Sequence, residues 1–249
     1  MNAYLQNVSK IEFVVTNACN GSCKHCSQGS HDAPYAYIEP RVAANSVRRI
    51  TRHYDIHTVM AFGGEPLLHP DAVCAIMAAA RDAGVPHRQV ITNGCFTKDV
   101  ARMHEVAARL AGAGVTDLLV SVDAFHQETL PIEAVRLFLV AAKENGLPAR
   151  LQPAWLVSAA DENPYNEKTR KLISSLADLH LSTGSGNVIF PEGNATRHLA
   201  AYFAENIPEN PYRDDPYDLR CISFEADGSV LGGNVYARDI LDILDAYAP

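Results

Sequence analysis

A short loop near the amino terminus gathers three cysteines whose spacing favours metal chemistry. Cys19, Cys23 and Cys26 fall within eight residues, and thiolates are soft ligands that suit zinc or iron–sulfur clusters. A structural zinc site needs four ligands, and His25, the obvious fourth, stands where its side chain should point away. Three cysteines on a 4Fe-4S cluster would leave one iron open to a small molecule. We therefore favour the cluster and keep zinc as the alternative. The other cysteines stand alone in the sequence: Cys74, Cys95 and Cys221.

The rest of the chain alternates between apolar, β-rich runs and helical patterns. Such alternation predicts an α/β fold of parallel strands joined by right-handed crossovers. Six units are too few for an eight-stranded barrel and suit a partial (β/α)6 TIM-like barrel. The expected strands are 11–15, 58–62, 89–92, 118–122, 151–157 and 187–190, and the expected helices are 42–54, 71–83, 98–111, 132–145 and 166–181.

Polar and glycine-rich residues follow the expected strands at their carboxyl ends, where parallel α/β folds carry their functional loops. The cysteine loop follows the first strand. The residues at or directly after the ends of the next three strands are Gly63, Gly64, Glu65, Asn93, Ser121 and Asp123. We expect this one rim to form the functional site.

The alternation stops near residue 200, which suggests two parts. Residues 9–200 form the expected core domain, and residues 201–249 a short hairpin-plus-helix extension. Within the extension, 207–220 is rich in proline and acids and indicates a linker. A hairpin is expected over 222–231 around Asp227 and Gly228, and a helix over 236–247.

Two motifs resemble those of the radical S-adenosylmethionine (SAM) superfamily. The spacing CxxxCxxC from Cys19 to Cys26 follows the first strand, and the segment Gly63-Gly64-Glu65-Pro66 resembles the GGEP motif of that family. The resemblance extends over about residues 9–195 and implies the partial (β/α)6 barrel. It also implies that the three cysteines hold a 4Fe-4S cluster whose open iron chelates SAM.

The resemblance implies a reaction as well. A one-electron donor such as flavodoxin or ferredoxin reduces the cluster, and SAM splits into methionine and a 5′-deoxyadenosyl radical. That radical removes a hydrogen atom from a peptide or small-metabolite substrate, and the outcome is epimerisation, dehydrogenation or bond formation. The protein's own part is to orient the cofactor and exclude water.

The remaining rim residues have a cofactor role and an ordinary structural role that the sequence leaves open. Gly63 and Gly64 admit close approach of a ligand, and Glu65 can accept from the SAM ammonium group. Ser121 and Asp123 could bind the ribose, although an aspartate there could also cap the next helix. Further candidates are Asn93 for SAM contact or a turn, His25 for adenine packing, Val188 and Ile189 for the adenine pocket, and Gln152 and Trp155 by strand position.

The segment around Cys221 resembles the start of the auxiliary-cluster (SPASM or twitch) extensions of peptide-modifying radical SAM enzymes. No cysteine follows Cys221, so we expect a degenerate extension without an auxiliary cluster. Cys221 could be a buried structural thiol, a hydrogen-atom donor to a substrate radical, or a lone ligand. His126, just after Asp123, could act as an acid or base, or could simply start a helix at the surface.

Composition removes several other classes. A net charge of −8 without a cationic stripe disfavours nucleic-acid binding. No apolar run could span a membrane, and the first residues do not resemble a signal peptide, so we expect a cytoplasmic protein. Two alternatives remain: an activase of a glycyl-radical enzyme, and a zinc or iron–sulfur protein without catalysis. The activase is disfavoured because its usual Asp–Lys pair on the fourth strand is replaced by Asp123-Ala124.

Overall fold

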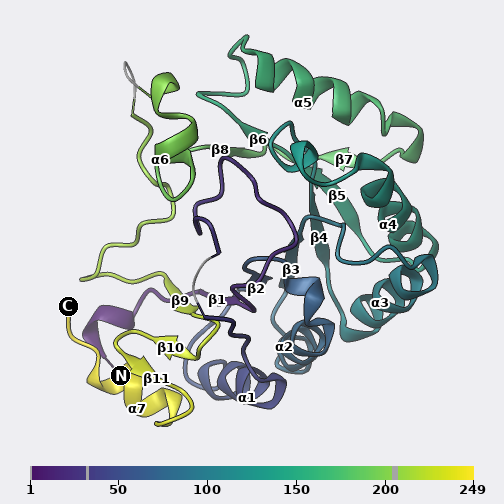
Figure 1. The fold of residues 1–249 in the computed structure, drawn as a ribbon. Coiled ribbons are helices and arrows are strands. Elements are labelled where there is room, and N and C mark those ends of the chain that lie inside the picture. Colours follow the sequence, from purple (N-terminus) through teal and green to yellow (C-terminus); the bar gives the residue numbers. More distant parts are fainter. Residues whose placement is uncertain (1, 32–33, 204–206) are drawn as a thin grey trace.

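The computed structural model describes residues 2–31, 34–203 and 207–249, so residues 204–206 of the expected extension lie outside it (Figure 1). Its centre is a seven-stranded sheet in the order β7-β5-β4-β3-β2-β1-β9, and every neighbouring pair in it is parallel. The strands are β1 (Lys10–Val14), β2 (Thr58–Phe62), β3 (His87–Thr92), β4 (Asp117–Ser121), β5 (Ala149–Gln152), β7 (Ser182–Thr183) and β9 (Cys221–Phe224). This is the partial barrel that the sequence predicts.

Helices cover the outside of the curved sheet, as Figure 1 shows. The longer ones are α1 (Pro40–Ile50), α2 (Pro70–Asp82), α3 (Val100–Ala113), α4 (Ile132–Glu144) and α5 (Pro164–Ser174). Their ends follow from local chemistry. Proline starts α1, α2 and α5, the side chain of Asp99 caps α3, and Gly114 ends α3 in the left-handed conformation. Short helices lie in the connections: η1 (Ala3–Leu5), η2 (Pro66–Leu68), η3 (His126–Glu128), η4 (Ala177–Leu179), α6 (Ala195–His198) and η5 (Ala200–Tyr202).

The two faces of the sheet differ in character. On β1, Ile11 and Phe13 are fully buried toward the helices, whereas the side chains of Lys10 and Glu12 are 29% and 19% exposed on the concave side. The same alternation continues on the neighbouring strands because successive side chains of a strand point to opposite faces. The helix-facing side is therefore the core, and the concave side carries polar and charged groups.

The strands expected over 151–157 and 187–190 are each interrupted. Pro153 lacks a backbone N–H and separates β5 from β6 (Ala154–Trp155). The strand beside β5 is β7, while β8 (Asn187–Val188) pairs with β6 in a separate small sheet. Gly186, at φ +79°, lies between β7 and β8 and lets the chain bend there.

The carboxyl-terminal segment supplies a strand to the central sheet. β9 pairs with the free edge of β1, and the rings of Phe13 and Phe224 stack with centroids 4.5 Å apart. Ile222 and Phe224 are fully buried, so β9 belongs to the core. The hairpin expected over 222–231 therefore does not start there, and the antiparallel strand pair lies further along the chain. It joins β10 (Ser229–Val230) to β11 (Gly233–Asn234), and α7 (Ile240–Ala246) follows. Among the described residues, no helix is long and apolar enough to cross a membrane.

Candidate functional site

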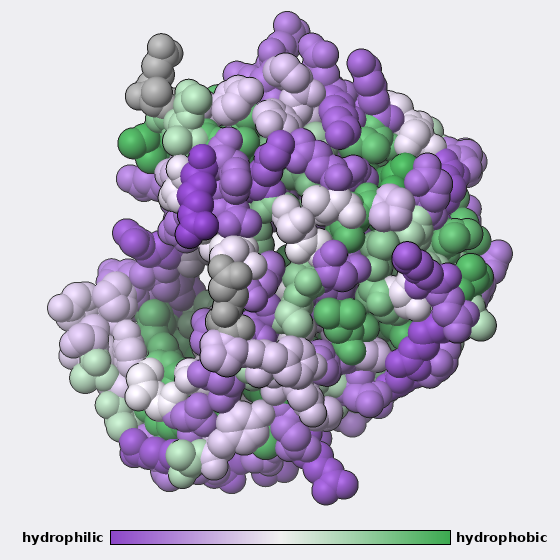
Figure 2. All heavy atoms as spheres, viewed as in Figure 1, coloured by the Kyte–Doolittle hydropathy of each residue, from purple (hydrophilic) through white to green (hydrophobic). Residues whose placement is uncertain are grey.

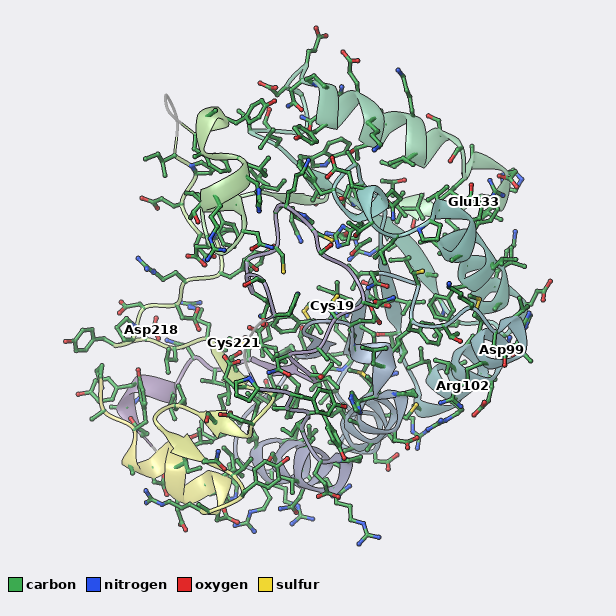
Figure 3. All side chains as sticks on the ribbon, in the orientation of Figure 1. Cys19, Asp99, Arg102, Glu133, Asp218 and Cys221 are labelled. Atoms are coloured by element: carbon green, nitrogen blue, oxygen red, sulfur yellow. The ribbon has the colours of Figure 1, made fainter. Side chains whose placement is uncertain are left out.

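The cysteine loop leaves β1 and is tied back to it at its base. Thr16 forms a β-bridge with Tyr37, and the N–H of Ile38 donates to Val15 O at 2.9 Å. The loop therefore projects from the carboxyl end of β1, and Figure 3 shows Cys19 within the ring of strands and Cys221 apart from it at β9. The expected rim position of the three cysteines agrees with this geometry.

The two glycines of the GGEP segment pack against the cysteine loop itself. An added Cβ at Gly64 would lie 2.0 Å from Ala18 O, and one at Gly63 would lie 2.7 Å from Thr16 O. Both backbones are joined by hydrogen bonds, with Gly64 N donating to Thr16 O and Glu65 N to Ala18 O, each at 2.8 Å. The two glycines are therefore needed for the cysteine loop to pack against this segment. The sequence suggested only that they admit close approach of a ligand, and it did not predict this packing role.

Glu65 is a buried carboxylate that joins two rim segments. Its Oε1 accepts from Leu67 N at 2.9 Å and from Thr92 Oγ1 at 2.7 Å, and its Oε2 accepts from Asn93 N at 2.8 Å. Burial raises the pKa of Glu65, and these three donors oppose that rise. The carboxylate fixes the geometry of the rim between β2 and β3, and its remaining acceptor capacity lies on Oε2.

The three thiols are free, and Cys23 is buried while Cys19 and Cys26 are half-buried. Burial raises the pKa of Cys19, Cys23 and Cys26, and for Cys23 the neighbouring charges of Asp123 and the other two thiols add to the rise. A bound metal reverses this preference, since it stabilises the thiolate form directly. The donor set of three gathered thiols therefore fits a 4Fe-4S cluster.

The side chain of His25 turns into the rim instead of away from it. Its ring lies 5.0 Å from that of Phe125 and 4.8 Å from that of His126, measured between centroids. Burial lowers the pKa of His25 to about 4, and its buried Nδ1 has no hydrogen-bond partner among the described residues. A neutral planar ring with an unused polar atom fits the expected packing against adenine.

His126 forms a buried pair with Asp123. Its Nδ1 lies 2.7 Å from Asp123 Oδ2, while Asp123 Oδ1 accepts from the backbone N–H groups of Phe125 and His126. Burial opposes ionisation of both groups, but their mutual attraction lowers the pKa of Asp123 to about 2 and raises that of His126. Asp123 thus organises the turn after β4, which was the structural alternative to ribose binding.

A second possible metal grouping overlaps the thiols. One ligating atom each of Cys23, His25 and His126 lie within 4.8 Å of one another. This grouping keeps the zinc alternative chemically possible, although it would use one cysteine of the three. The loop that gathers all three thiols is better explained by a cluster.

The other expected rim residues lie around the same opening. Ser121 is buried at the end of β4, and Gln152 on β5 donates through Nε2 to Asn187 Oδ1 at 3.3 Å. Trp155 is buried and donates to Ser185 O, and Ile189 is buried while Val188 is 37% exposed. The polar groups among them, Ser121 and Gln152, stand in register on neighbouring strands.

Cys221 lies at the amino ends of the strands, opposite the rim that carries the cysteine loop. It is the first residue of β9 and pairs in register with Lys10, the first residue of β1. Burial raises the pKa of its thiol, and the adjacent Glu12 carboxylate raises it further. Lys10 Nζ and Glu12 Oε2 form an ion pair at 2.6 Å beside it. The structure therefore separates Cys221 from the three clustered thiols and places it on the concave face.

Three contributors to the site were not expected from the sequence. Thr129 Oγ1 accepts from Ser22 N of the cysteine loop, His31 Nε2 lies 3.6 Å from Cys26 Sγ, and Asn20, itself in the loop, donates to Cys95 O. They belong to irregular segments without periodicity, so nothing in the sequence marks them. Only the left-handed φ of +58° at His31 distinguishes it in the structure.

The fold and the gathered thiols together define a partial-barrel protein with a cluster-binding loop at the carboxyl ends of its strands. Residues 13–144, just over half of the chain, match the family model of the radical SAM superfamily. The chain belongs to this superfamily, a class of enzymes that work with SAM and a 4Fe-4S cluster. The family expected from the motifs, and with it the two cofactors, is confirmed.

Individual relatives are more distant. The chain is 26% identical over 203 residues to a probable GTP 3′,8-cyclase of Saccharolobus islandicus, and the match covers 77% of this chain and 63% of that protein. Among solved structures, Streptococcus suis SuiB bound to SAM has a TM-score of 0.58 at 12% identity, covering 96% of this chain and 66% of SuiB. AnSMEcpe with bound SAM has a TM-score of 0.57 at 16% identity, covering 93% of this chain and 76% of its own. These structures show the shared fold.

Proposed function

We propose that this protein reductively cleaves SAM at a 4Fe-4S cluster held by Cys19, Cys23 and Cys26 and uses the resulting radical on a peptide or small polar substrate. The observation that carries the proposal is the gathering of three free thiols on a loop that the Gly63-Gly64 segment holds over the rim. When bound, the cluster and SAM together supply an oxidising carbon radical. The electron would come from a one-electron donor such as flavodoxin or ferredoxin.

The chain's own residues would orient and enclose the cofactor. Gly63 and Gly64 fix the loop, Glu65 has acceptor capacity toward an ammonium group, and His25 offers its ring to the adenine. Ser121 and Asp123 remain our candidates for the ribose, with the Asp123 carboxylate held by His126. Burial of these groups supports a water-poor site, in which a reactive intermediate would be protected.

The concave face of the sheet is our proposed substrate side. The cations that the described part of this face presents on β1 and β5, Lys10 and Arg150, are each paired with a carboxylate, Lys10 with Glu12 and Arg150 with Asp117 at 2.9 Å. A polyanionic ligand such as a nucleoside triphosphate would have to break these pairs. The pairing therefore favours a peptide or an uncharged polar metabolite over the GTP named for the cyclase relatives.

We keep Cys221 as the candidate hydrogen-atom donor. Its neutral thiol is the form that can give up a hydrogen atom, and the raised pKa favours that form. Its position on the concave face, away from the cluster loop, suits a donor that approaches a substrate from the opposite side. Retention of stereochemical outcome and rate in the Cys221→Ala variant would exclude this role. His126 stays a candidate acid or base at the mouth of the barrel.

Two other functions compete with this proposal. A glycyl-radical activase would share the cluster chemistry, and adding a candidate partner enzyme would produce a radical on that partner. A non-catalytic zinc protein would instead use the grouping of Cys23, His25 and His126. We also propose a reducing compartment, the cytoplasm, because the cysteines are free.

The direct test is a cleavage assay. Anaerobically reconstituted protein is incubated with dithionite and SAM, and methionine and 5′-deoxyadenosine are quantified by chromatography. The proposal expects both products in equal amounts, and expects none from the variant with all three loop cysteines changed to alanine. Fully loaded protein that leaves SAM intact would contradict the proposal.

A further inference from the structure

Two polar side chains outside the ligand set lie beside the loop thiols. Asn93 directly follows β3, and Thr129 directly follows η3, so they come from different segments of the rim. Asn93 Nδ2 lies 3.8 Å from Cys19 Sγ, and the Thr129 side chain, which accepts from Ser22 N, lies beside Cys23 and lowers the pKa of its thiol. Each of these two cysteines therefore has its own side-chain neighbour.

The orientation of the Asn93 amide is fixed by its other bonds. Its Oδ1 accepts from Cys95 N at 2.8 Å, so Nδ2 must face the cysteine loop. One of the two Nδ2 hydrogens goes to Asn20 Oδ1 at 2.9 Å, which leaves the second for Cys19 Sγ. Asn93 is 5% exposed, so water does not compete for that hydrogen. Its amide is thus a dedicated donor to the sulfur.

The Thr129 hydroxyl stands at an exposed position beside the cysteine loop. Its oxygen accepts from Ser22 N at 3.4 Å, which ties the side chain to the loop, and its single hydrogen is available to the sulfur of Cys23. The Asn93 amide can only donate through Nδ2, and the Thr129 hydroxyl can only donate to Cys23 once that sulfur is a thiolate, as it would be when it holds a cluster. His31, beside Cys26, is not such a donor in its neutral form, because its Nδ1 donates to Asn17 O at 2.9 Å and its Nε2 can then only accept.

Resting on the proposed function, we propose that Asn93 and Thr129 are positioning residues that set the reduction potential of the cluster. Hydrogen bonds to the sulfur ligands of iron–sulfur centres withdraw electron density and favour the reduced state. Reduction adds one electron to the cluster, supplied by the one-electron donor, and breaks no bond in either side chain. The two donors therefore make that electron easier to accept. This role of Asn93 toward Cys19 adds to the two that the sequence left open, the SAM contact and the turn, and the bond from Cys95 N to its Oδ1 supports the turn.

The test measures the midpoint potential of the loaded cluster in a redox titration followed by electron paramagnetic resonance. Thr129→Val removes the hydroxyl at nearly constant volume, and Asn93→Asp keeps the acceptor for Cys95 N while it replaces the donor by oxygen. We expect both midpoints to become more negative, with the larger shift in Asn93→Asp because a carboxylate near the sulfur adds repulsion. Thr129→Ser restores the hydroxyl and should restore the wild-type potential.

A matched control is Thr116→Val, because the Thr116 hydroxyl bonds only the backbone of Arg88 next to the amino end of β4. Its midpoint should equal that of the wild type. Loaded Thr129→Val and Asn93→Asp proteins with unchanged potentials would overturn the inference. So would iron loss in Thr129→Val with an unchanged potential in its loaded fraction, which would indicate a purely structural role. Wild-type protein that binds no four-iron cluster would instead overturn the proposed function, and this inference with it.

Discussion

The protein contains two thiol regions that differ in almost every physical respect. Cys19, Cys23 and Cys26 lie on one irregular loop at the carboxyl ends of the strands, and neighbouring side chains contact all three of their sulfurs. Cys221 lies on a regular strand, β9, at the amino ends of the strands, beside the ion pair of Lys10 and Glu12. A metal cluster needs the first arrangement, since several ligands must converge on it. The second arrangement keeps a single thiol neutral and in place.

The two regions are held in place by different contacts. The loop is held by backbone contacts that tolerate no added side-chain atoms, as at Gly64, whereas Cys221 is held by the register of the sheet. Positions on the loop are therefore sensitive to small steric changes. Cys221 should tolerate replacement without effect on the loop.

The largest expected effect is the loss of the cluster itself. Changing Cys19, Cys23 and Cys26 together to alanine should abolish iron binding, the brown colour and SAM cleavage, because no sulfur ligands remain on the loop. Iron analysis and absorbance after anaerobic reconstitution check this. Cys74→Ala, on α2, is the control and should retain full iron. Equal iron in the triple variant and the control would show that the loop is not the binding site.

The next effect tests the steric support of the loop. Gly64→Ala places a methyl group 2.0 Å from Ala18 O, and we expect a loss of about 3 kcal/mol in the free energy of unfolding together with reduced iron binding. Gly112→Ala is the matched control, since its added methyl group meets no atom within 4 Å in α3, and it should stabilise by about 0.5–1 kcal/mol. Urea titrations of both variants measure the difference. Equal stabilities would contradict the loop packing.

A smaller effect, dependent on pH, concerns the Asp123–His126 pair. The folded pKa of His126 is raised and that of Asp123 is lowered to about 2, so the pair stabilises the protein fully between their ordinary values of about 3.9 and 6.5. It loses this contribution as pH rises through the raised pKa of His126. Asp123→Asn should cost about 2 kcal/mol at pH 6 and less at high pH. Urea unfolding of metal-free wild type and variant at several pH values gives the comparison. A cost that grows with pH would show that the pair is not ionised as described.

The smallest effect is expected at Cys221. Cys221→Ala should leave iron content and SAM cleavage unchanged and lower the free energy of unfolding by about 1 kcal/mol, since one partly buried thiol is removed. The same assays as for the triple variant provide the measurement. Loss of iron on this substitution would make Cys221 a ligand and remove the contrast between the two regions.

The sequence predicted those features that depend on periodicity or on fixed spacing. The partial barrel follows from repeated strand and helix patterns, and the thiol loop from CxxxCxxC after the first strand. Features that depend on contacts between distant parts of the chain could not be predicted from the sequence. The pairing of β9 with β1 required knowing which edge of the sheet was free, and the roles of Thr129 and Asn20 depend on loop geometry. The strand expected over 151–157 was wrong at Pro153, although a proline within a strand is a signal of a break that the sequence itself carries. The division at residue 200 stays a prediction.

The central claim is that the loop holds a cluster with an iron free to bind SAM. The most direct measurement is metal and sulfide analysis of the anaerobically reconstituted protein, with the paramagnetic spectrum of the reduced protein recorded before and after SAM is added. The account predicts four irons and four sulfides per chain and a spectrum that changes with SAM. One zinc per chain, or a four-iron spectrum unaffected by SAM, would contradict it.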